Sequence, residues 1–76
     1  MVTVLSKKIC PQCDMTKKLL TREGIPFEEI RMDEDEAALA RAKDLGYLQA
    51  PVVITESGEH WSGFRPDLIK TLKQAA

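Results

Sequence analysis

The sequence predicts an α/β fold in which a four-stranded mixed sheet is flanked by three helices. The expected elements alternate in the order strand, helix, strand, helix, strand, strand, helix. The opening strand–helix–strand unit implies a right-handed crossover between parallel strands. A short polar turn late in the chain implies an antiparallel hairpin instead. The sheet is therefore expected to be mixed, with helices on both faces.

The first half of the chain supplies two strands and one helix. Residues 2–5, VTVL, are rich in β-branched side chains and predict a strand. A helix is expected in the stretch after Cys13, and Gly24 is placed to end it. Residues 27–32, FEEIRM, alternate enough to predict the second strand. The apolar side chains of the helix are expected to share one face: Met15, Leu19 and Leu20.

A second helix is expected after this strand. Asp33 has the character of an N-cap, with Glu36 three residues later as the other half of a capping box. The acidic run DEDE suits a helix N-terminus, where the helix dipole favours negative charge. Gly46 is expected to stop the helix. Its apolar side is predicted to consist of Ala38, Leu39, Ala42 and Leu45.

The last third of the chain predicts a hairpin and a final helix. Residues 51–55, PVVIT, form a continuous apolar run that is typical of a strand covered on both faces. The turn ESGE leads to a short antiparallel partner at 60–62, HWS. Pro66 suits the first position of a helix. That helix is expected to dock through Leu68, Ile69 and Leu72.

Composition limits the class of protein. The chain has 76 residues, 43% hydrophobic and 30% charged, with a formal net charge of -1. We expect one domain spanning residues 1–76, and a monomer. The near-neutral balance offers no general attraction to nucleic acid or to an anionic membrane. No apolar run approaches the roughly 18 residues that span a bilayer, and the start lacks a secretory h-region. A cytoplasmic protein is therefore expected.

The two cysteines, in CPQC, allow three interpretations. A structural disulfide is disfavoured, because a ring this small constrains the unfolded chain very little. A closed zinc site needs four ligands, and the sequence offers Cys10, Cys13 and one histidine, His60. A metal or iron–sulfur binding module using the same cysteines remains as an alternative of another class. The third interpretation is a redox-active dithiol.

The redox interpretation accounts for where the cysteines lie. Cys10 would stand at the N-terminus of the first helix, where free N–H groups and the helix dipole stabilise a thiolate. Lys7 and Lys8 would add positive potential, and Pro11 suits an N-terminal helix position. The i, i+3 spacing brings Cys13 within reach of Cys10. A Cys-x-x-Cys beside a βαβ pattern is a thioredoxin-like signal.

These residues predict a dithiol oxidoreductase without a cofactor or a bound metal. Cys10 is expected to attack a substrate disulfide and form a mixed disulfide. Cys13 then attacks Cys10, which releases the reduced substrate and leaves an internal disulfide. An external reductant must restore the dithiol. His60 is expected to be an exposed strand residue and not a catalytic base.

Three stretches carry a resemblance to a known family. The sequences CPQC, LGYLQAPVV and HWSGFRPDLI together resemble the NrdH-type redoxins, which are small glutaredoxin-like proteins of the thioredoxin fold. The resemblance extends over essentially the whole chain, and the run Trp-Ser-Gly-Phe-Arg-Pro is its most discriminating part. It implies that Pro51 is a cis-proline facing the cysteines, with Ala50 lending backbone groups to a substrate strand. The implied substrate and partner groove consists of Pro11, Gln12, Ala50, Pro51, Trp61, Ser62, Gly63, Phe64 and Arg65.

The resemblance also implies partners. NrdH-type redoxins are reduced by NADPH through thioredoxin reductase and donate electrons to class Ib ribonucleotide reductase. Pro11 departs from this pattern, since NrdH-type motifs commonly have an aliphatic residue there and glutaredoxins have proline. Lys7 matches the basic residue of a glutathione site, but Gln12 replaces its aromatic residue and the segment 62–65 replaces its Gly-Gly-x-Asp turn. A glutathione-dependent glutaredoxin is therefore the alternative, and a protein reductase is favoured.

Overall fold

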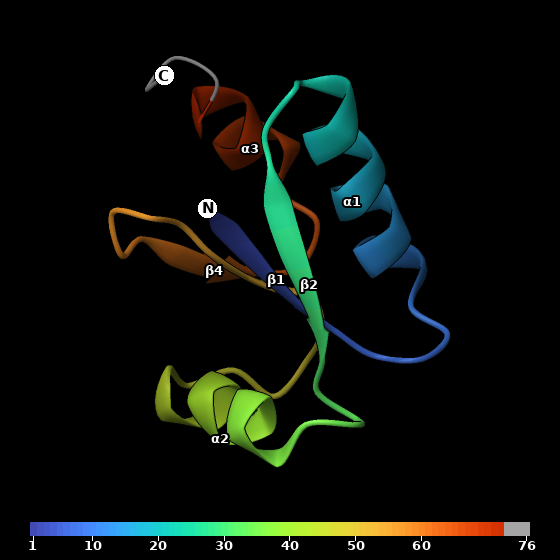
Figure 1. Cartoon of the computed structure of the whole chain (residues 1–76), viewed down its shortest axis with the longest axis vertical. Helices are drawn as coiled ribbons and strands as arrows, with labels where there is room; N and C mark the ends of the chain where they lie inside the picture. The colour runs from blue at the N-terminus through green and yellow to red at the C-terminus, as the bar shows by residue number, and fades with distance from the viewer. Residues whose placement is uncertain (73–76) are drawn as a thin grey trace.

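The computed structural model describes residues 1–72 and shows the predicted order of elements (Figure 1). Each strand forms where the apolar or β-branched runs lie, and each helix starts near a capping residue or a proline. The strands are β1 (Val2–Ser6), β2 (Phe27–Arg31), β3 (Val52–Ile54) and β4 (His60–Ser62). The helices are α1 (Pro11–Arg22), α2 (Glu36–Asp44) and α3 (Pro66–Leu72).

The four strands form one mixed sheet in the order β2-β1-β3-β4. β1 runs parallel to β2, with Val4 opposite Glu29. β1 is antiparallel to β3, and β3 is antiparallel to β4, so that Val53 lies between Val4 and Trp61. The predicted parallel start and antiparallel hairpin are both confirmed. The thioredoxin-like arrangement thus places the first strand, which leads to the cysteines, in the centre of the sheet.

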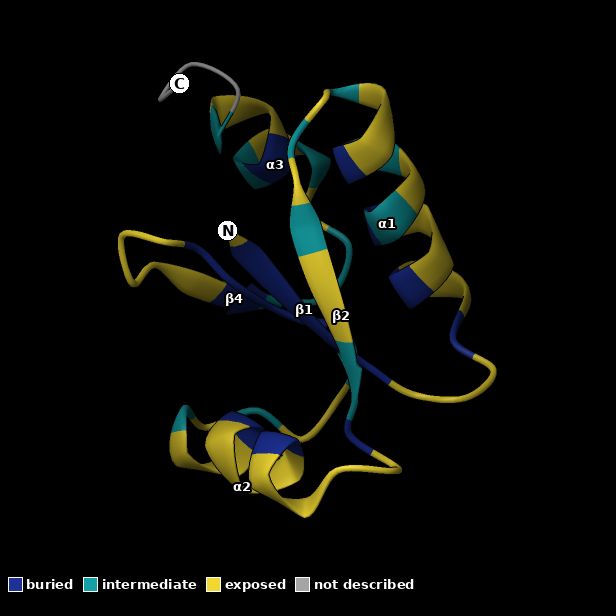
Figure 2. Cartoon of the chain, viewed as in Figure 1, coloured by how far each residue is buried: buried dark blue, intermediate teal, exposed yellow. Residues whose placement is uncertain are grey.

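The helices cover both faces of this sheet, as predicted: α1 and α3 lie on one face and α2 lies on the other (Figure 1). Side chains alternate along a strand, so the central strands contribute to two cores. Val4 and Val53 pack with Leu20 and Ile69 from α1 and α3. Leu5 belongs to the opposite core, with Val52 and Ile54 from β3 and with Ala38 and Ala42 from α2. Figure 2 shows β1 buried throughout, whereas the edge strand β2 is intermediate or exposed along its length.

Helix α1 begins at Pro11 and therefore includes Cys13. Its buried stripe consists of Cys13, Thr16 and Leu20, which are spaced to share one helical face. The prediction that Met15 faces the core is wrong, since 46% of Met15 is exposed. Met15 lies off the stripe because it is two residues after Cys13, which places it about 200° around the helix. Gly24, with φ 72°, follows the last turn as predicted.

Helix α2 begins two residues later than the predicted cap implied. Asp35, and not Asp33, is the N-cap, and its carboxylate accepts a hydrogen bond from the Ala38 N–H at 3.0 Å. Asp33 instead lies in a turn after β2, where its carboxylate accepts a hydrogen bond from Arg31 Nε at 2.8 Å. The predicted burial of Leu39 is also wrong, since 40% of this side chain is exposed. The remaining predicted contacts, Ala38, Ala42 and Leu45, lie in or against the core.

The end of the described chain agrees with the prediction. Residues 51–55 are all buried, and the Thr55 N–H donates to the Glu59 carbonyl at 2.8 Å to close the turn of the hairpin. Pro66 is the first residue of α3, whose Ile69 is fully buried and whose Leu68 and Leu72 pack against the core. Within residues 1–72, no helix is both long enough and apolar enough to cross a membrane.

Candidate active site

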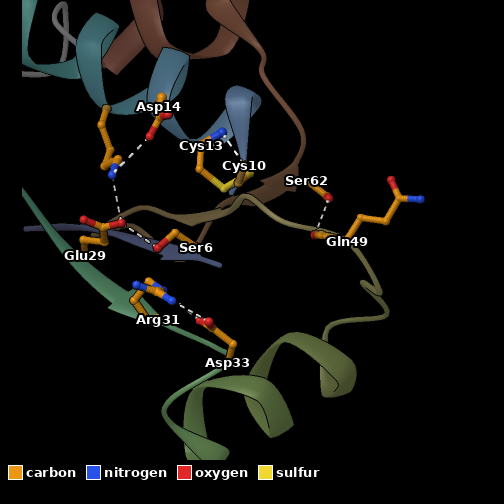
Figure 3. Close-up of a disulfide and its surroundings, with 10 residues drawn as sticks. Ser6, Cys10, Cys13, Asp14, Glu29, Arg31, Asp33, Gln49 and Ser62 are labelled. Carbon is orange, nitrogen blue, oxygen red and sulfur yellow. Dashed lines mark hydrogen bonds and ion pairs between the residues drawn. A yellow bond between two sulfur atoms is a disulfide. The ribbon is translucent and has the colours of Figure 1, made fainter. Parts of the chain in front are cut away.

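The two cysteines form a disulfide at the N-terminus of α1 (Figure 3). The loop after β1 delivers Cys10 to the N-cap position, and Pro11 starts the helix. Cys10 is 7% exposed and Cys13 is 1% exposed. Both cysteines are thus buried, and Cys10 has the larger exposed fraction of the two.

The helix N-terminus gives Cys10 a hydrogen-bond donor. The Cys13 N–H donates to Cys10 Sγ at 3.1 Å, and this is the bond that a capping side chain normally makes. A negatively charged sulfur at this place would keep the same donor and gain from the helix dipole. The geometry can therefore stabilise the thiolate that a thiol–disulfide exchange requires.

The loop before Cys10 carries the two lysines that were predicted to add positive potential. Both Lys7 and Lys8 are exposed. The Arg31 side chain is the main cause that lowers the pKa of the neighbouring Asp33 to about 2, and the Lys8 backbone makes a small further contribution. Ile9 has a φ of 55° and is 85% exposed, so an apolar side chain projects into solvent directly before the accessible cysteine.

Three separate segments of the predicted groove meet beside the disulfide. The Ala50–Pro51 peptide bond is cis, as the resemblance implied. The Gly63 N–H donates to the Pro51 carbonyl at 2.9 Å. A Cβ atom at Gly63, whose φ is 88°, would lie 3.6 Å from Gln12 Oε1. A Cβ would fit at this distance, so glycine is favoured here by the positive φ and not by lack of room, and the loop after β4 lies near both the cis-proline and Gln12.

A further hydrogen bond holds the loop after β4 against the segment before Pro51. Ser62 Oγ donates to the Gln49 carbonyl at 3.1 Å, as Figure 3 shows. Ala50 is half-buried and packs against the core on the α2 face. The segments 49–51 and 62–63 are therefore fixed relative to each other.

Three other residues of the predicted groove, Trp61, Phe64 and Arg65, pack against the core or pair with another side chain. Trp61 is only 6% exposed and belongs to the core with Leu20 and Ile69, so it offers little surface to a partner. Phe64 is half-buried against the same core. Arg65 is exposed and is engaged with Asp67 in the first turn of α3, with Nε 3.2 Å from Oδ1. This pair raises the pKa of the arginine and lowers the pKa of Asp67.

The sequence did not predict a polar cluster that lies near the disulfide in Figure 3. Ser6, which is fully buried at the end of β1, donates to Glu29 Oε2 at 2.6 Å. Lys17 Nζ donates to the same oxygen at 3.0 Å and lies 3.6 Å from Asp14. The Ser6 hydrogen bond and then Lys17 lower the pKa of Glu29, and Glu29 in turn raises the pKa of Lys17. Local sequence patterns do not reveal this cluster, because its members belong to three different elements.

His60, the histidine considered as a metal ligand, is exposed as predicted and pairs with another side chain. Its Nδ1 lies 2.8 Å from the Tyr47 hydroxyl, and the two rings contact edge to face. Within the described part of the chain, no three His, Cys, Asp or Glu side chains are grouped so as to hold a metal ion.

Comparisons with known proteins agree with this geometry. Residues 2–61 match the family model for glutaredoxin. The chain is 43% identical over 72 residues to the glutaredoxin-like protein NrdH of Lactococcus lactis subsp. lactis, covering 95% of this chain and 99% of the relative. It is 39% identical over 75 residues to NrdH of Escherichia coli K12, covering 97% and 90%.

A solved structure extends the likeness to three dimensions. The NrdH-redoxin from Escherichia coli superposes with a TM-score of 0.87 at 38% identity, covering 93% of this chain and 92% of that one. Sequence and fold are thus similar over nearly the full length of both chains, and the Cys10–Cys13 disulfide lies at the N-terminus of α1. The chain belongs to the glutaredoxin family as one of its NrdH-type, glutaredoxin-like members, and it is a thiol–disulfide oxidoreductase.

Proposed function

We propose that this oxidoreductase is reduced by NADPH through thioredoxin reductase and donates electrons to the large subunit of class Ib ribonucleotide reductase. The near full-length similarity to NrdH proteins carries the proposal. The related Escherichia coli NrdH-redoxin is described as a glutaredoxin-like protein with a thioredoxin-like activity profile. A dithiol carrier works in a reducing compartment, so we also propose that the protein is cytoplasmic. We further propose that it is a monomer with one domain over residues 1–76.

The proposed cycle uses the two sulfurs in turn. The Cys10 thiolate attacks a substrate disulfide, and one substrate sulfur leaves as a thiolate that takes a proton from solvent. Cys13 loses its proton, and its thiolate attacks Cys10 Sγ. The Cys10–Cys13 bond forms as the Cys10–substrate bond breaks, and the second substrate sulfur leaves with its electron pair. The substrate has then gained two electrons, and two electrons from NADPH, delivered through the reductase dithiol, restore Cys10 and Cys13.

The groove beside the disulfide would receive the substrate strand. Pro11 and Gln12 lie between the cysteines, and Gly63 lies against the Gln12 side chain. The Pro51 carbonyl is occupied by the Gly63 N–H, so the backbone groups offered to a substrate would come from Ala50. In this proposal Lys7 and Lys8 contribute positive potential beside Cys10.

Glutathione is the competing reductant. A related glutaredoxin from buckwheat has been solved in complex with glutathione, at 25% identity and a TM-score of 0.73 to this chain. Here Pro11 and Gln12 lie between the cysteines, so no aromatic residue is present there, and Arg65 is paired with Asp67. That pairing leaves the Arg65 guanidinium less free for a glutathione carboxylate, and both features favour a protein reductase.

The test compares two reductants. NADPH consumption is followed with a disulfide substrate and this chain, once with thioredoxin reductase and once with glutathione plus glutathione reductase. We expect turnover only with thioredoxin reductase, and none from the matched variant Cys10→Ser. Turnover only with glutathione would overturn the proposed reductant. A parallel assay of class Ib ribonucleotide reductase, with this chain as its sole electron donor, tests the proposed acceptor.

A further inference from the structure

Thr16 is a buried hydroxyl without a hydrogen-bond partner. It lies in α1 one helical turn after Cys13, its exposed fraction is 0%, and its Oγ1 makes no hydrogen bond. Nearly all buried polar groups in proteins are paired, because an unsatisfied hydroxyl loses its bonds to water without replacing them. The redox cycle described above assigns no role to this group.

The other helical threonines of residues 1–72 behave differently. Thr21 Oγ1 donates to the Lys17 carbonyl at 2.9 Å, and Thr71 Oγ1 donates to the Leu68 carbonyl at 2.6 Å. Such bonds to the preceding turn are the usual partners of a threonine in a helix. The corresponding acceptors for Thr16 would be the Gln12 and Cys13 carbonyls, and the Thr16 hydroxyl uses neither. Its lack of a partner therefore distinguishes it from the other helical threonines of the described residues.

The position of Thr16 on α1 relates it to the resolving cysteine. Side chains on a helix lean toward its N-terminus and lie over the turn three and four residues earlier. Thr16 thus lies over the turn that contains Cys13, and both belong to the buried stripe of α1. In the disulfide state, Cys13 Sγ is bonded to Cys10, where sulfur carries no charge and is a weak acceptor. A Cys13 thiolate is a much stronger acceptor.

We propose that Thr16 is a positioning residue for Cys13, with a hydroxyl that donates a hydrogen bond to Cys13 Sγ once the disulfide is open. During resolution of the mixed disulfide, Cys13 gives its proton to solvent and the Thr16 hydroxyl stabilises the resulting thiolate. That thiolate attacks Cys10 Sγ, the internal disulfide forms, and the substrate sulfur leaves with its electron pair. Thr16 keeps its own proton throughout. The Thr16 hydroxyl has no partner in the disulfide state and gains one when the disulfide is open. It therefore favours the reduced state over the disulfide state.

The substitution Thr16→Val keeps the shape of the side chain and removes the donor. Reduction then becomes less favourable, so the thiol–disulfide equilibrium with dithiothreitol should shift about tenfold toward the protein disulfide. This shift corresponds to a reduction potential about 30 mV more negative for a two-electron couple. The pH at which the mixed disulfide resolves at half its maximal rate should rise, because the Cys13 thiolate has lost its donor. Thr16→Ser, which retains a hydroxyl, should stay close to the wild-type chain in both measurements.

The matched control is Leu20→Val, which alters the same buried stripe of α1 one turn further on and should leave the potential and the pH profile unchanged. The inference is overturned if Thr16→Val has the wild-type potential and pH profile, or if Thr16→Ser shifts both as far as Thr16→Val does. A further measurement needs no variant. In a high-resolution structure of the reduced wild-type chain, Thr16 Oγ1 should lie within hydrogen-bond distance of Cys13 Sγ, and a bond to the Gln12 carbonyl instead would contradict the proposal.

Discussion

At the scale of single residues, the two sulfurs have different surroundings although only Pro11 and Gln12 separate them. Cys10 has the larger exposed fraction and accepts the Cys13 N–H, whereas Cys13 is almost completely buried on the inner stripe of α1. An attacking sulfur needs access to the substrate and a donor for its charge. A resolving sulfur needs only to reach its neighbour, so burial suits Cys13.

This difference predicts opposite results for two matched serine variants. Cys13→Ser should accumulate covalent complexes with disulfide substrates, because Cys10 still attacks and nothing resolves the mixed disulfide. Cys10→Ser should form none, since the remaining thiol is buried. Non-reducing electrophoresis followed by mass spectrometry measures both, and trapping by both variants or by neither would contradict the assigned roles.

At the scale of elements, helix α2 has Asp35 as its N-cap, whereas the local sequence pattern predicted Asp33. Asp35 satisfies the Ala38 N–H, whereas Asp33 accepts hydrogen bonds from Arg31. An N-cap aspartate stabilises a helix by satisfying one of its free N–H groups.

Asp35→Ala should therefore lower the free energy of unfolding by about 1 kcal/mol. The matched variant Asp33→Ala should lower it less, because its ion pair with Arg31 is exposed and screened by solvent. Urea denaturation followed by circular dichroism compares the two. A larger loss in Asp33→Ala would show that the cap is assigned to the wrong aspartate.

Glu29 connects three elements, because its carboxylate accepts from Ser6 in β1 and from Lys17 in α1 while it belongs to β2. Its pKa is lowered from the ordinary value of 4.5 in the folded chain. The ionised carboxylate therefore stabilises the fold above pH 4.5, and this contribution is lost as the pH falls through the lowered folded-state pKa.

Glu29→Gln should flatten the fall in unfolding free energy below pH 4.5, relative to the wild-type chain. Ser6→Ala, which removes the largest cause of the lowered pKa, should flatten it in part. Denaturation curves recorded from pH 7 downward measure the slope, and two variants that both retain the wild-type slope would exclude this role for Glu29.

At the scale of the whole molecule, the central strands are buried on both faces, and each face has its own helices. α3 closes the core on the α1 side through Ile69, which is fully buried beside Leu20 and Trp61. The loop that reaches Pro51 and Gln12 lies between β4 and α3. Packing of α3 thus also helps to hold one side of the proposed groove.

Ile69→Ala should lower the free energy of unfolding by roughly 2–5 kcal/mol, the usual cost of such a cavity. That is a large share of the total for a small domain. Leu48→Ala removes a comparable side chain that is 88% exposed and should change stability by less than about 0.5 kcal/mol. Equal losses in the two variants, measured by denaturant titration, would contradict the assignment of the core.

The order and type of the elements, the parallel start, the late hairpin and the redox pair are all predictable from the sequence. These features depend on local signals: the β-branched runs, the glycines and prolines at helix ends, and the spacing of Cys10 and Cys13. The resemblance to NrdH-type redoxins added the cis bond at Pro51, which the structure contains.

Which side chains meet depends on the packing of elements that are far apart in the sequence. It placed Thr16 and not Met15 on the buried stripe, and it brought Ser6 to Glu29. It also brought Gly63 to Pro51. Each of these outcomes depends on the strand order β2-β1-β3-β4 and on the direction in which a helix lies across the sheet. Residues far apart in sequence meet only when those long-range pairings form, and periodicity within one segment carries no information about them.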